Sequence, residues 1–110
     1  MSDKKIVLTT AGSRQEAETI AHALVERRLA ACANIVGPIH SVYRWQGKVE
    51  TADEHLLIIK TTAALFDAVG KAIRELHSYE LPECIQLPIE GGSAEYLRWI
   101  EESVAGNAGN

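Results

Sequence analysis

The feature that most restricts the fold of this chain is a pair of long β-prone segments joined by a tight turn. The first runs from Cys32 to Trp45 and the second from Val49 to Thr61, with the turn signal Gln46-Gly47 before the second. About a dozen residues at roughly 3.3 Å each reach about 40 Å, whereas a globule of this length has a radius of gyration of only about 13 Å. The distal part of this hairpin must therefore project beyond its own core.

The projecting tip carries the apolar side chains of Tyr43, Trp45 and Val49. Aromatic surface and open strand edges in water favour association with other chains. Pro38 near the start of the first arm indicates an edge strand or a bulge, and the alternative is that a bulge breaks the arms into short strands. We expect an oligomer rather than a monomer.

The first helix is predicted over residues 14 to 28, after a buried strand over residues 5 to 10. Ser13 and Glu16 fit a capping box, in which the Ser13 hydroxyl accepts from the Glu16 amide and the Glu16 side chain reaches back. The apolar residues at helical spacing, which we expect on the inner face, are Ala17, Ile20, Ala21, Leu24 and Val25.

The second half of the chain repeats this alternation. A second helix is predicted over residues 65 to 76 with Thr61 or Thr62 as its N-cap, followed by a short strand over residues 84 to 89. Ser93 caps a last helix, whose expected inner residues are Tyr96, Leu97, Ile100 and Val104.

This element order is strand, helix, hairpin, helix, strand, helix. It predicts an α+β fold, a ferredoxin-like (split β-α-β) sandwich with a long central hairpin and an extra C-terminal helix. A doubly wound parallel sheet is excluded, because it needs a helix between all strands.

The 110 residues fit a single domain over residues 1–104, and the tail 105–110 (AGNAGN) has nothing to bury and is expected to be disordered. The net charge of −4 includes no basic stripe, which argues against nucleic acid, and there is no polybasic or long apolar segment for a membrane. We therefore expect a cytoplasmic protein, in which Cys32 and Cys84 are two free, buried thiols.

Groups that could carry chemistry are sparse. His77 opens a loop that also holds Tyr79, Glu80 and Glu83, a donor set that could hold Cu²⁺ or Zn²⁺. The alternative, which the residues alone favour, is a histidine that only complements the dipole at a helix C-terminus.

The sequence evidence for a catalytic site is weaker than the evidence for a metal site. Arg14 at a helix N-terminus, helped by Asn34, could bind an anion in the manner of a small acyl-phosphate hydrolase on this fold, but capping by Ser13 already explains the turn. Because no Ser-His-acid or Cys-His nucleophile can be assembled, we expect no enzyme.

A series of short motifs resembles the CutA divalent-cation-tolerance family over residues 5 to 104. The motifs are Leu29-Ala30-Ala31-Cys32-Ala33-Asn34-Ile35, Ser41-x-Tyr43-x-Trp45-x-Gly47-x-Val49-Glu50, Glu54, Lys60-Thr61, His77-x-Tyr79, Pro82-Glu83 and Tyr96-Leu97-x-Trp99-Ile100. The resemblance implies a homotrimer similar to the PII signalling proteins, with hairpin arms pairing between subunits and with Tyr43, Trp45 and Trp99 in the trimer packing. It also implies a role in tolerance to copper and other divalent metals, without an established enzymatic activity, an obligatory cofactor or a known partner protein.

The copper site of the family carries over only in part. Members with such a site use a cysteine at the end of the first strand and two adjacent histidines before a Pro-Tyr. Here Thr9 and Leu76 hold the cysteine and first histidine positions, His77 alone matches, and Ser78 replaces the proline. One imidazole is a poor transition-metal site unless trimer symmetry or nearby carboxylates complete it.

The resemblance further implies an inter-subunit cleft. Its candidate lining residues are Trp45, Glu50, Glu54, Lys60, Tyr79 and Glu83. Buried charge needs pairing, so we expect Lys60 to face Glu54 or Glu83, and purely structural pairing is an equal alternative to a ligand pocket.

Three functional hypotheses follow. The first is a non-enzymatic trimer linked to the divalent-metal response. The second is a PII-like sensor that binds a small anionic ligand or a protein in its clefts. The third is an acyl-phosphate hydrolase that uses Arg14 and Asn34.

Overall fold

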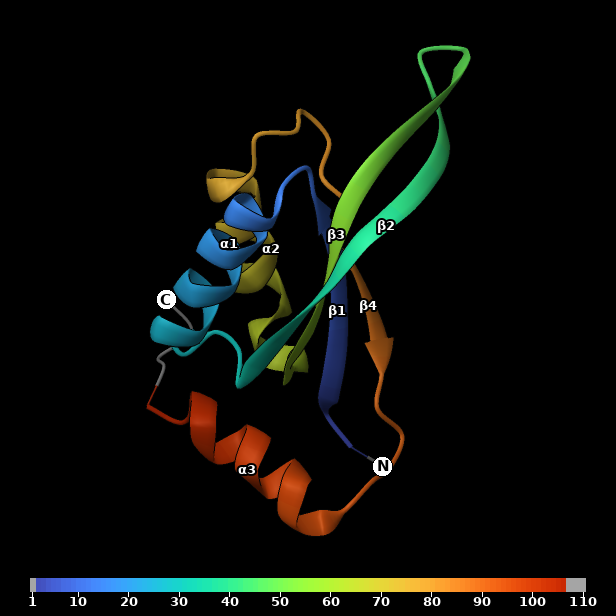
Figure 1. Cartoon of the computed structure of the whole chain (residues 1–110). Helices are drawn as coiled ribbons and strands as arrows, with labels where there is room; N and C mark the ends of the chain where they lie inside the picture. The colour runs from blue at the N-terminus through green and yellow to red at the C-terminus, as the bar shows by residue number, and fades with distance from the viewer. Residues whose placement is uncertain (1, 107–110) are drawn as a thin grey trace.

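The long hairpin dominates the shape of the computed structural model, which describes residues 2–106. Strands β2 (Cys32–Trp45) and β3 (Lys48–Thr62) are 14 and 15 residues long. The turn between them has positive φ at both central residues, 51° at Gln46 and 82° at Gly47, the pattern of the type I′ turn that suits twisted antiparallel arms. The hairpin projects from the rest of the molecule (Figure 1), and the molecule with its hairpin has extents of 43 × 26 × 22 Å.

The strands form one sheet in the order β2-β3-β1-β4, and each neighbouring pair is antiparallel. The central strand β1 spans Lys4–Ala11, whereas β4 (Ile85–Pro88) is a short edge strand and β2 forms the other edge. Strands β1 and β2 therefore run parallel with β3 between them, and β3 and β4 run parallel with β1 between them. This is the arrangement that two split β-α-β units produce.

Helices α1 (Arg14–Glu26) and α2 (Phe66–Leu76) lie against the same face of the sheet (Figure 1). A single 3₁₀ turn, η1 (Ala63–Leu65), links β3 to α2. Helix α3 (Ala94–Val104) lies across the end of the sheet where β1 begins, and Lys4 Nζ forms an ion pair of 2.9 Å with Glu101 on that helix. The predicted α+β class is confirmed, with four antiparallel strands and three α-helices in residues 2–106.

The bulge predicted near Pro38 is present. The register between β2 and β3 shifts between Val36 and Ile39, yet pairing continues on both sides as far as Trp45 and Lys48. The alternative of two short, broken arms is therefore wrong, because the bulge bends the strand without ending it.

The core lies between the sheet and the first two helices. Alternate residues of β1 and β3 face this layer, because successive side chains of a strand point to opposite faces. The largest fully buried side chains include Val7, Ile20, Leu24, Leu57, Ile59, Val69 and Ile73. Burial of each such side chain contributes about 1.5–3 kcal/mol to folding.

Two residues predicted on inner helix faces are exposed. Val25 is 41% exposed, because eight residues after Ala17 the helix has turned about 80° away from that residue, beyond the edge of the buried stripe. Tyr96 is 44% exposed and stacks against Trp99 with ring centroids 5.3 Å apart, while Ile100 and Val104 supply the buried side of α3.

Several local predictions need correction. Helix α1 ends at Glu26, two residues earlier than expected. Thr62 makes no side-chain cap, and the Thr61 hydroxyl donates to the Leu29 carbonyl at 2.6 Å instead. The two thiols are free, but both are half-buried rather than buried. Residues 107–110 of the predicted disordered tail lie outside the described residues, and the domain boundary at residue 104 stays a prediction.

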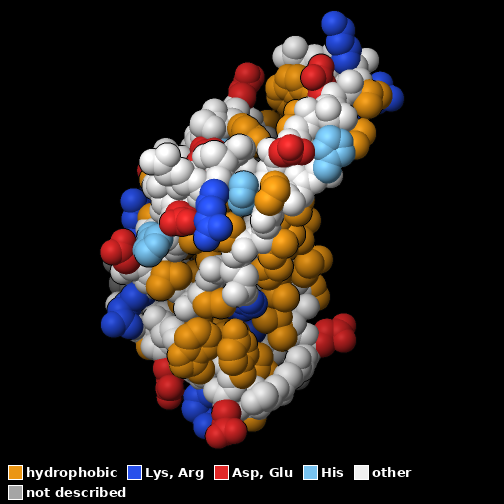
Figure 2. All heavy atoms as spheres, viewed as in Figure 1, with side chains coloured by type: hydrophobic (Ala, Val, Ile, Leu, Met, Phe, Trp, Pro, Cys, Tyr) orange, Lys and Arg blue, Asp and Glu red, His pale blue; other side chains and the backbone are white. Residues whose placement is uncertain are grey.

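The second face of the sheet is apolar and lies opposite α1 and α2. Its side chains come from alternate positions, among them Ile6, Leu8, Val36, Leu56, Ile58, Ile85 and Leu87. Val36, Ile85 and Leu87 are exposed. In Figure 2, hydrophobic side chains gather over the sheet and over α3. None of the helices within residues 2–106 has the length and hydropathy to cross a membrane.

Candidate functional site

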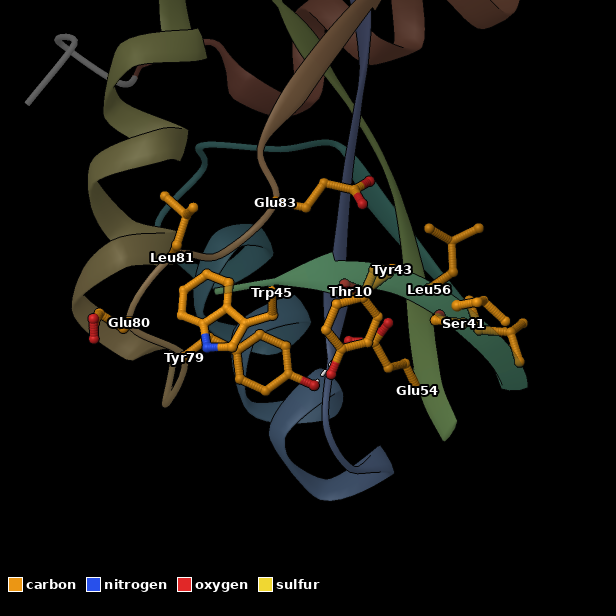
Figure 3. Close-up of a pocket in the computed structure, with 12 residues that line it drawn as sticks. Thr10, Ser41, Tyr43, Trp45, Glu54, Leu56, Tyr79, Glu80, Leu81 and Glu83 are labelled. Carbon is orange, nitrogen blue, oxygen red and sulfur yellow. Dashed lines mark hydrogen bonds between the residues drawn. The ribbon is translucent and has the colours of Figure 1, made fainter. Parts of the chain in front are cut away.

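A pocket of about 680 Å³ lies where the hairpin leaves the core (Figure 3). One wall is β2, which contributes Ile39, Ser41, Tyr43 and Trp45. Opposite this wall lies the loop between α2 and β4, which contributes Tyr79, Leu81 and Glu83, and the floor includes Glu54 and Leu56 of β3. The pocket therefore joins three segments that are distant in the sequence.

Glu54 is the most buried charged residue of this pocket, with only 7% of its surface exposed. The Tyr79 hydroxyl donates a hydrogen bond of 2.8 Å to Glu54 Oε2. Burial, and next the Glu54 carboxylate, raise the pKa of Tyr79 well above its usual value, so the phenol stays a neutral donor. No ion pair reaches Glu54 from any of residues 2–106.

Within one chain Lys60 does not face Glu54 or Glu83, and its pairing with a carboxylate of a neighbouring chain stays a prediction. Its Nζ donates to the Asn34 Oδ1 on β2. Lys60 and Glu54 do lie on the same face of β3, but six residues of extended strand separate them by about 20 Å. Strand alternation predicts the shared face correctly, and it says nothing about proximity.

The six predicted cleft residues thus divide into two groups. Trp45, Glu54, Tyr79 and Glu83 come together in the pocket. Lys60 lies toward the other end of β3, and Glu50 pairs with Tyr43 nearer the hairpin tip, outside the pocket lining.

The loop that carries Tyr79 is held by Glu16 at the start of α1. Ser13 caps the helix as predicted, since its hydroxyl accepts from the Glu16 amide at 3.1 Å. The Glu16 side chain reaches back as predicted, but its carboxylate accepts from the Gly12 amide at 3.3 Å rather than from Ser13, and it also accepts from the Ser78 amide at 2.6 Å. Partial burial raises the pKa of Glu16, but these amides and His77 together outweigh it, and the net pKa lies below its usual value.

His77 lies in the same network, and its side chain is fully buried. One ring nitrogen, Nε2, lies 2.6 Å from the Thr10 carbonyl oxygen, and the other, Nδ1, accepts from the Tyr79 amide at 3.1 Å. Nε2 therefore carries the proton, and the lone pair that a metal would need is directed at a backbone amide. Residues 2–106 contain no cluster of three or more His, Cys, Asp or Glu side chains suited to a metal. His77 does not fit a metal within one chain, and a site shared between chains stays a prediction.

The residues of the hydrolase hypothesis are not brought together. Arg14 lies in the helix layer, where its Nε donates to Glu18 at 2.9 Å. Asn34 pairs with Ile58 in the sheet, on the face opposite the helices, and accepts from Lys60. No shared anion site can form from these two side chains in this fold.

Strand alternation predicts the shared face of the β2 wall, whereas the contributions of Leu56 and Leu81 to the pocket were not predicted. Every second position along one arm is occupied by Ile39, Ser41, Tyr43 and Trp45, and this period places all four on one face. The part played by Glu16 had no such signal, because its partner Ser78 is 62 residues away in the chain.

Comparisons with known proteins agree with this fold. Residues 5–103 match the family described as CutA1 divalent ion tolerance protein. The Divalent-cation tolerance protein CutA of Thermus thermophilus is 48% identical over 100 residues, covering 91% of this chain and 97% of that protein. The Protein CutA of Homo sapiens is 43% identical over 93 residues, 84% of this chain, and this match spans only 52% of the human protein.

Solved structures extend the likeness to three dimensions. CutA from Xylella fastidiosa is 41% identical with a TM-score of 0.91, over 94% of this chain and 99% of that chain. The divalent cation tolerance protein of Thermus thermophilus has a TM-score of 0.89 at 48% identity, over 91% of this chain and 97% of that chain. Because the match covers nearly the whole described fold in sequence and in structure, the chain belongs to the CutA1 divalent ion tolerance protein family.

Proposed function

We propose that this chain acts as a cytoplasmic homotrimer in tolerance to divalent metal ions, copper among them, and that it catalyses no reaction. The observation that carries the proposal is the family match over residues 5–103, whose description names ion tolerance and no reaction. The similar protein of Thermus thermophilus bears the same description, divalent-cation tolerance.

The apolar face of the sheet supports assembly. Helix α3 meets this face only near the start of β1, where Lys4 pairs with Glu101, and the edge strands β2 and β4 leave backbone groups available for pairing. Tyr43, Trp45 and Trp99 are 43%, 38% and 43% exposed, more than such large apolar rings favour in a lone subunit. A ferredoxin-like, PII-like trimer with hairpins pairing between subunits would cover these surfaces with further copies of the same chain.

Trimer assembly is tested by measuring mass in solution. Native mass spectrometry and light scattering should give three chains per particle for the wild type. Trp45→Ala should shift the assembly toward smaller species at low concentration, because it removes a large apolar contact. Val25→Ala is the matched control, since Val25 is equally exposed but lies on α1, away from the hairpin. A monomeric wild type, or a Trp45→Ala protein that stays fully trimeric with unchanged melting temperature, would contradict the assembly.

Metal binding would have to use ligands from more than one chain, because a single chain has no suitable cluster in residues 2–106. Calorimetric titration of the assembled protein with Cu²⁺ and Zn²⁺ tests this directly. His77→Ala should abolish the heat of Cu²⁺ binding, whereas His22→Ala, which removes an exposed imidazole from α1, should not. Equal titrations of both variants would remove His77 from the site. In cells, deletion of the gene should lower growth at raised Cu²⁺, and unchanged tolerance would contradict the proposed role.

The pocket beneath the hairpin supports a second candidate, a PII-like ligand-binding trimer. A concave space of about 680 Å³ lined by aromatic and polar side chains is typical of a small-molecule site. Saturable thermal shifts with a small molecule would support this function, independently of any metal.

A further inference from the structure

Two polar side-chain atoms are buried in the chain without a hydrogen-bond partner from residues 2–106. They are the Thr9 hydroxyl oxygen, Oγ1, and the Nδ1 atom of His55. A buried polar atom without a hydrogen bond is costly, so native proteins pair nearly all such atoms with protein groups or with ordered water. Because both atoms are already buried inside one chain, assembly with further copies cannot supply their partners.

A second buried threonine shows how this fold satisfies such a hydroxyl from its own backbone. Thr61 on β3 is fully buried, as Thr9 is on β1, and its hydroxyl donates to the Leu29 carbonyl at 2.6 Å. The Thr9 hydroxyl is equally buried but has no such partner in residues 2–106. We therefore expect its partner to be a small molecule that the core can hold.

The two unpartnered atoms belong to the same face of neighbouring strands. Thr9 pairs with Leu57 and His55 pairs with Ala11, so Thr9 and His55 are diagonal neighbours on the face that packs against α1 and α2. Diagonal neighbours of an antiparallel pair lie about 7–8 Å apart. One bridging molecule of water spans about 5 Å, with two hydrogen bonds of about 2.8 Å each, so this spacing suits a bridge between the two side chains.

The His55 ring is oriented by Gly37 on β2. A Cβ at Gly37 would lie 2.6 Å from His55 Cδ2 and 2.9 Å from His55 Cγ, so the Cδ2 edge of the ring packs against β2. Nδ1 is bonded to Cγ on the other edge, and it is therefore directed toward β1, since β3 lies between β2 and β1 in the sheet. The residue of β1 that pairs with His55 is Ala11, whose small side chain leaves space beside this edge.

Water is the molecule whose chemistry fits these two groups. A hydroxyl and an imidazole nitrogen can both bond to an uncharged molecule, and residues 2–106 contain no cluster of three or more His, Cys, Asp or Glu side chains suited to a metal. Water both donates and accepts, so it can satisfy the Thr9 hydroxyl together with either tautomer of His55. Internal waters of proteins make roughly two to four such bonds to otherwise unsatisfied groups.

We propose that Thr9 Oγ1 and His55 Nδ1 hold one internal water molecule in each chain, and that this water links β1 to β3 at the base of the hairpin. The His55 ring then packs against Gly37 with one edge and is tied to the central strand by the other. The water thus steadies the ring that lies beneath the bulge of β2. The site is on the opposite face of the sheet from Glu54 and is independent of metal tolerance, of ligand binding in the pocket and of trimer assembly.

The first test counts long-lived internal waters by oxygen-17 magnetic relaxation dispersion, on the full-length protein in its native assembly. Thr9→Val keeps the shape of the side chain and removes the hydroxyl, so the count should fall by about one water per chain. Thr61→Val is the matched control, because it removes an equally buried hydroxyl whose partner is a carbonyl, and the count should stay unchanged. His55→Phe should lose the same water as Thr9→Val.

Crystallography, melting and NMR locate the water. A crystal structure of the wild type should show a water within hydrogen-bond distance of both atoms in every chain, and the structure of Thr9→Val should lack it. Thr9→Val should melt at a lower temperature than the wild type, because it leaves His55 Nδ1 without its bridge. In NMR spectra of the histidine side chains, the His55 Nδ1 resonance should move in Thr9→Val and stay in place in Thr61→Val.

Three outcomes would overturn the inference. An unchanged water count in Thr9→Val would show that the hydroxyl binds no ordered water. A Thr9→Val protein at least as stable as the wild type would show that the hydroxyl is unsatisfied in the native core, since removal of such a group costs no hydrogen bond. A direct hydrogen bond between Thr9 Oγ1 and His55 Nδ1 in the crystal structure would exclude a bridging water.

Discussion

Removal of the Glu16 carboxylate should destabilise the chain through a loop that lies 62 residues further along. The Glu16→Ala variant loses the acceptor for the Ser78 amide at 2.6 Å and for the Gly12 amide at 3.3 Å. A hydrogen bond to a charged group contributes about 1.5–3 kcal/mol. Both amides can take water instead, because the bonds lie near the surface, so we expect a total loss of about 1–2 kcal/mol in the free energy of unfolding.

The assay is urea unfolding followed by circular dichroism, at one protein concentration because assembly couples to stability. Glu18→Ala is the matched control, since Glu18 pairs with Arg14 in solvent on the same helix and such a pair contributes about 0–1 kcal/mol. Hydrogen exchange at the Ser78 and Tyr79 amides should accelerate in Glu16→Ala and stay unchanged in the control. If Glu16→Ala loses no more stability than Glu18→Ala, Glu16 does not hold the loop.

Two further predictions concern the same region. The folded pKa of Glu16 lies below its unfolded value of about 4.3, so its stabilisation is complete above that pH and is lost as the pH falls through the folded pKa. The difference in unfolding free energy between wild type and Glu16→Gln should therefore shrink below about pH 4, and a constant difference from about pH 7 to about pH 2.5 would contradict the assignment. Gly37→Ala places a Cβ 2.6 Å from His55 Cδ2 and 3.1 Å from the Glu54 carbonyl oxygen, and should cost about 1–3 kcal/mol in urea unfolding. Gly91→Ala, whose Cβ meets nothing within 4 Å, is its control, and equal stability of the two variants would refute the steric argument.

The fold was predictable because each helix and strand has a recognisable pattern in its own local sequence. The turn Gln46-Gly47 and the alternation beside it define the hairpin, and the apolar spacing from Ala17 to Leu24 defines the first helix. The burial of a helix residue was predicted wrongly where it depends on how wide a surface the helix packs against. Val25 and Tyr96 have the apolar character of inner residues but lie at the margin of their helical stripes, and periodicity alone does not say how wide the partner surface is.

The alternation of side chains between the two faces of a strand predicted only part of the site. Trp45 and Glu54 were placed in one cleft through the family resemblance, and the structure brings them together with Tyr79. Lys60 does not pair with Glu54 within one chain, because residues that share a face of an extended strand can lie far apart. The contact between Tyr79 and Glu54 depends on how a loop folds back over the sheet, and no local pattern encodes it.

The bulge between Val36 and Ile39 is the feature that makes the pocket possible. Before the bulge, even-numbered residues of β2 and of β3 lie together on the face of the sheet opposite α1 and α2, as Val36 pairs with Leu56. After it, Ile39 pairs with Glu54, so odd residues of β2 occupy that face. One extra residue in a strand reverses which side chains point to each side of a sheet. Without the bulge, the aromatic residue Trp45 would point to the face opposite Glu54, and the buried carboxylate would have no aromatic wall from the hairpin. The tight packing of Gly37 against His55 and the Glu54 backbone is therefore needed for the pocket as well as for the fold. A variant that removes the bulge should lose ligand binding even where the hairpin stays folded.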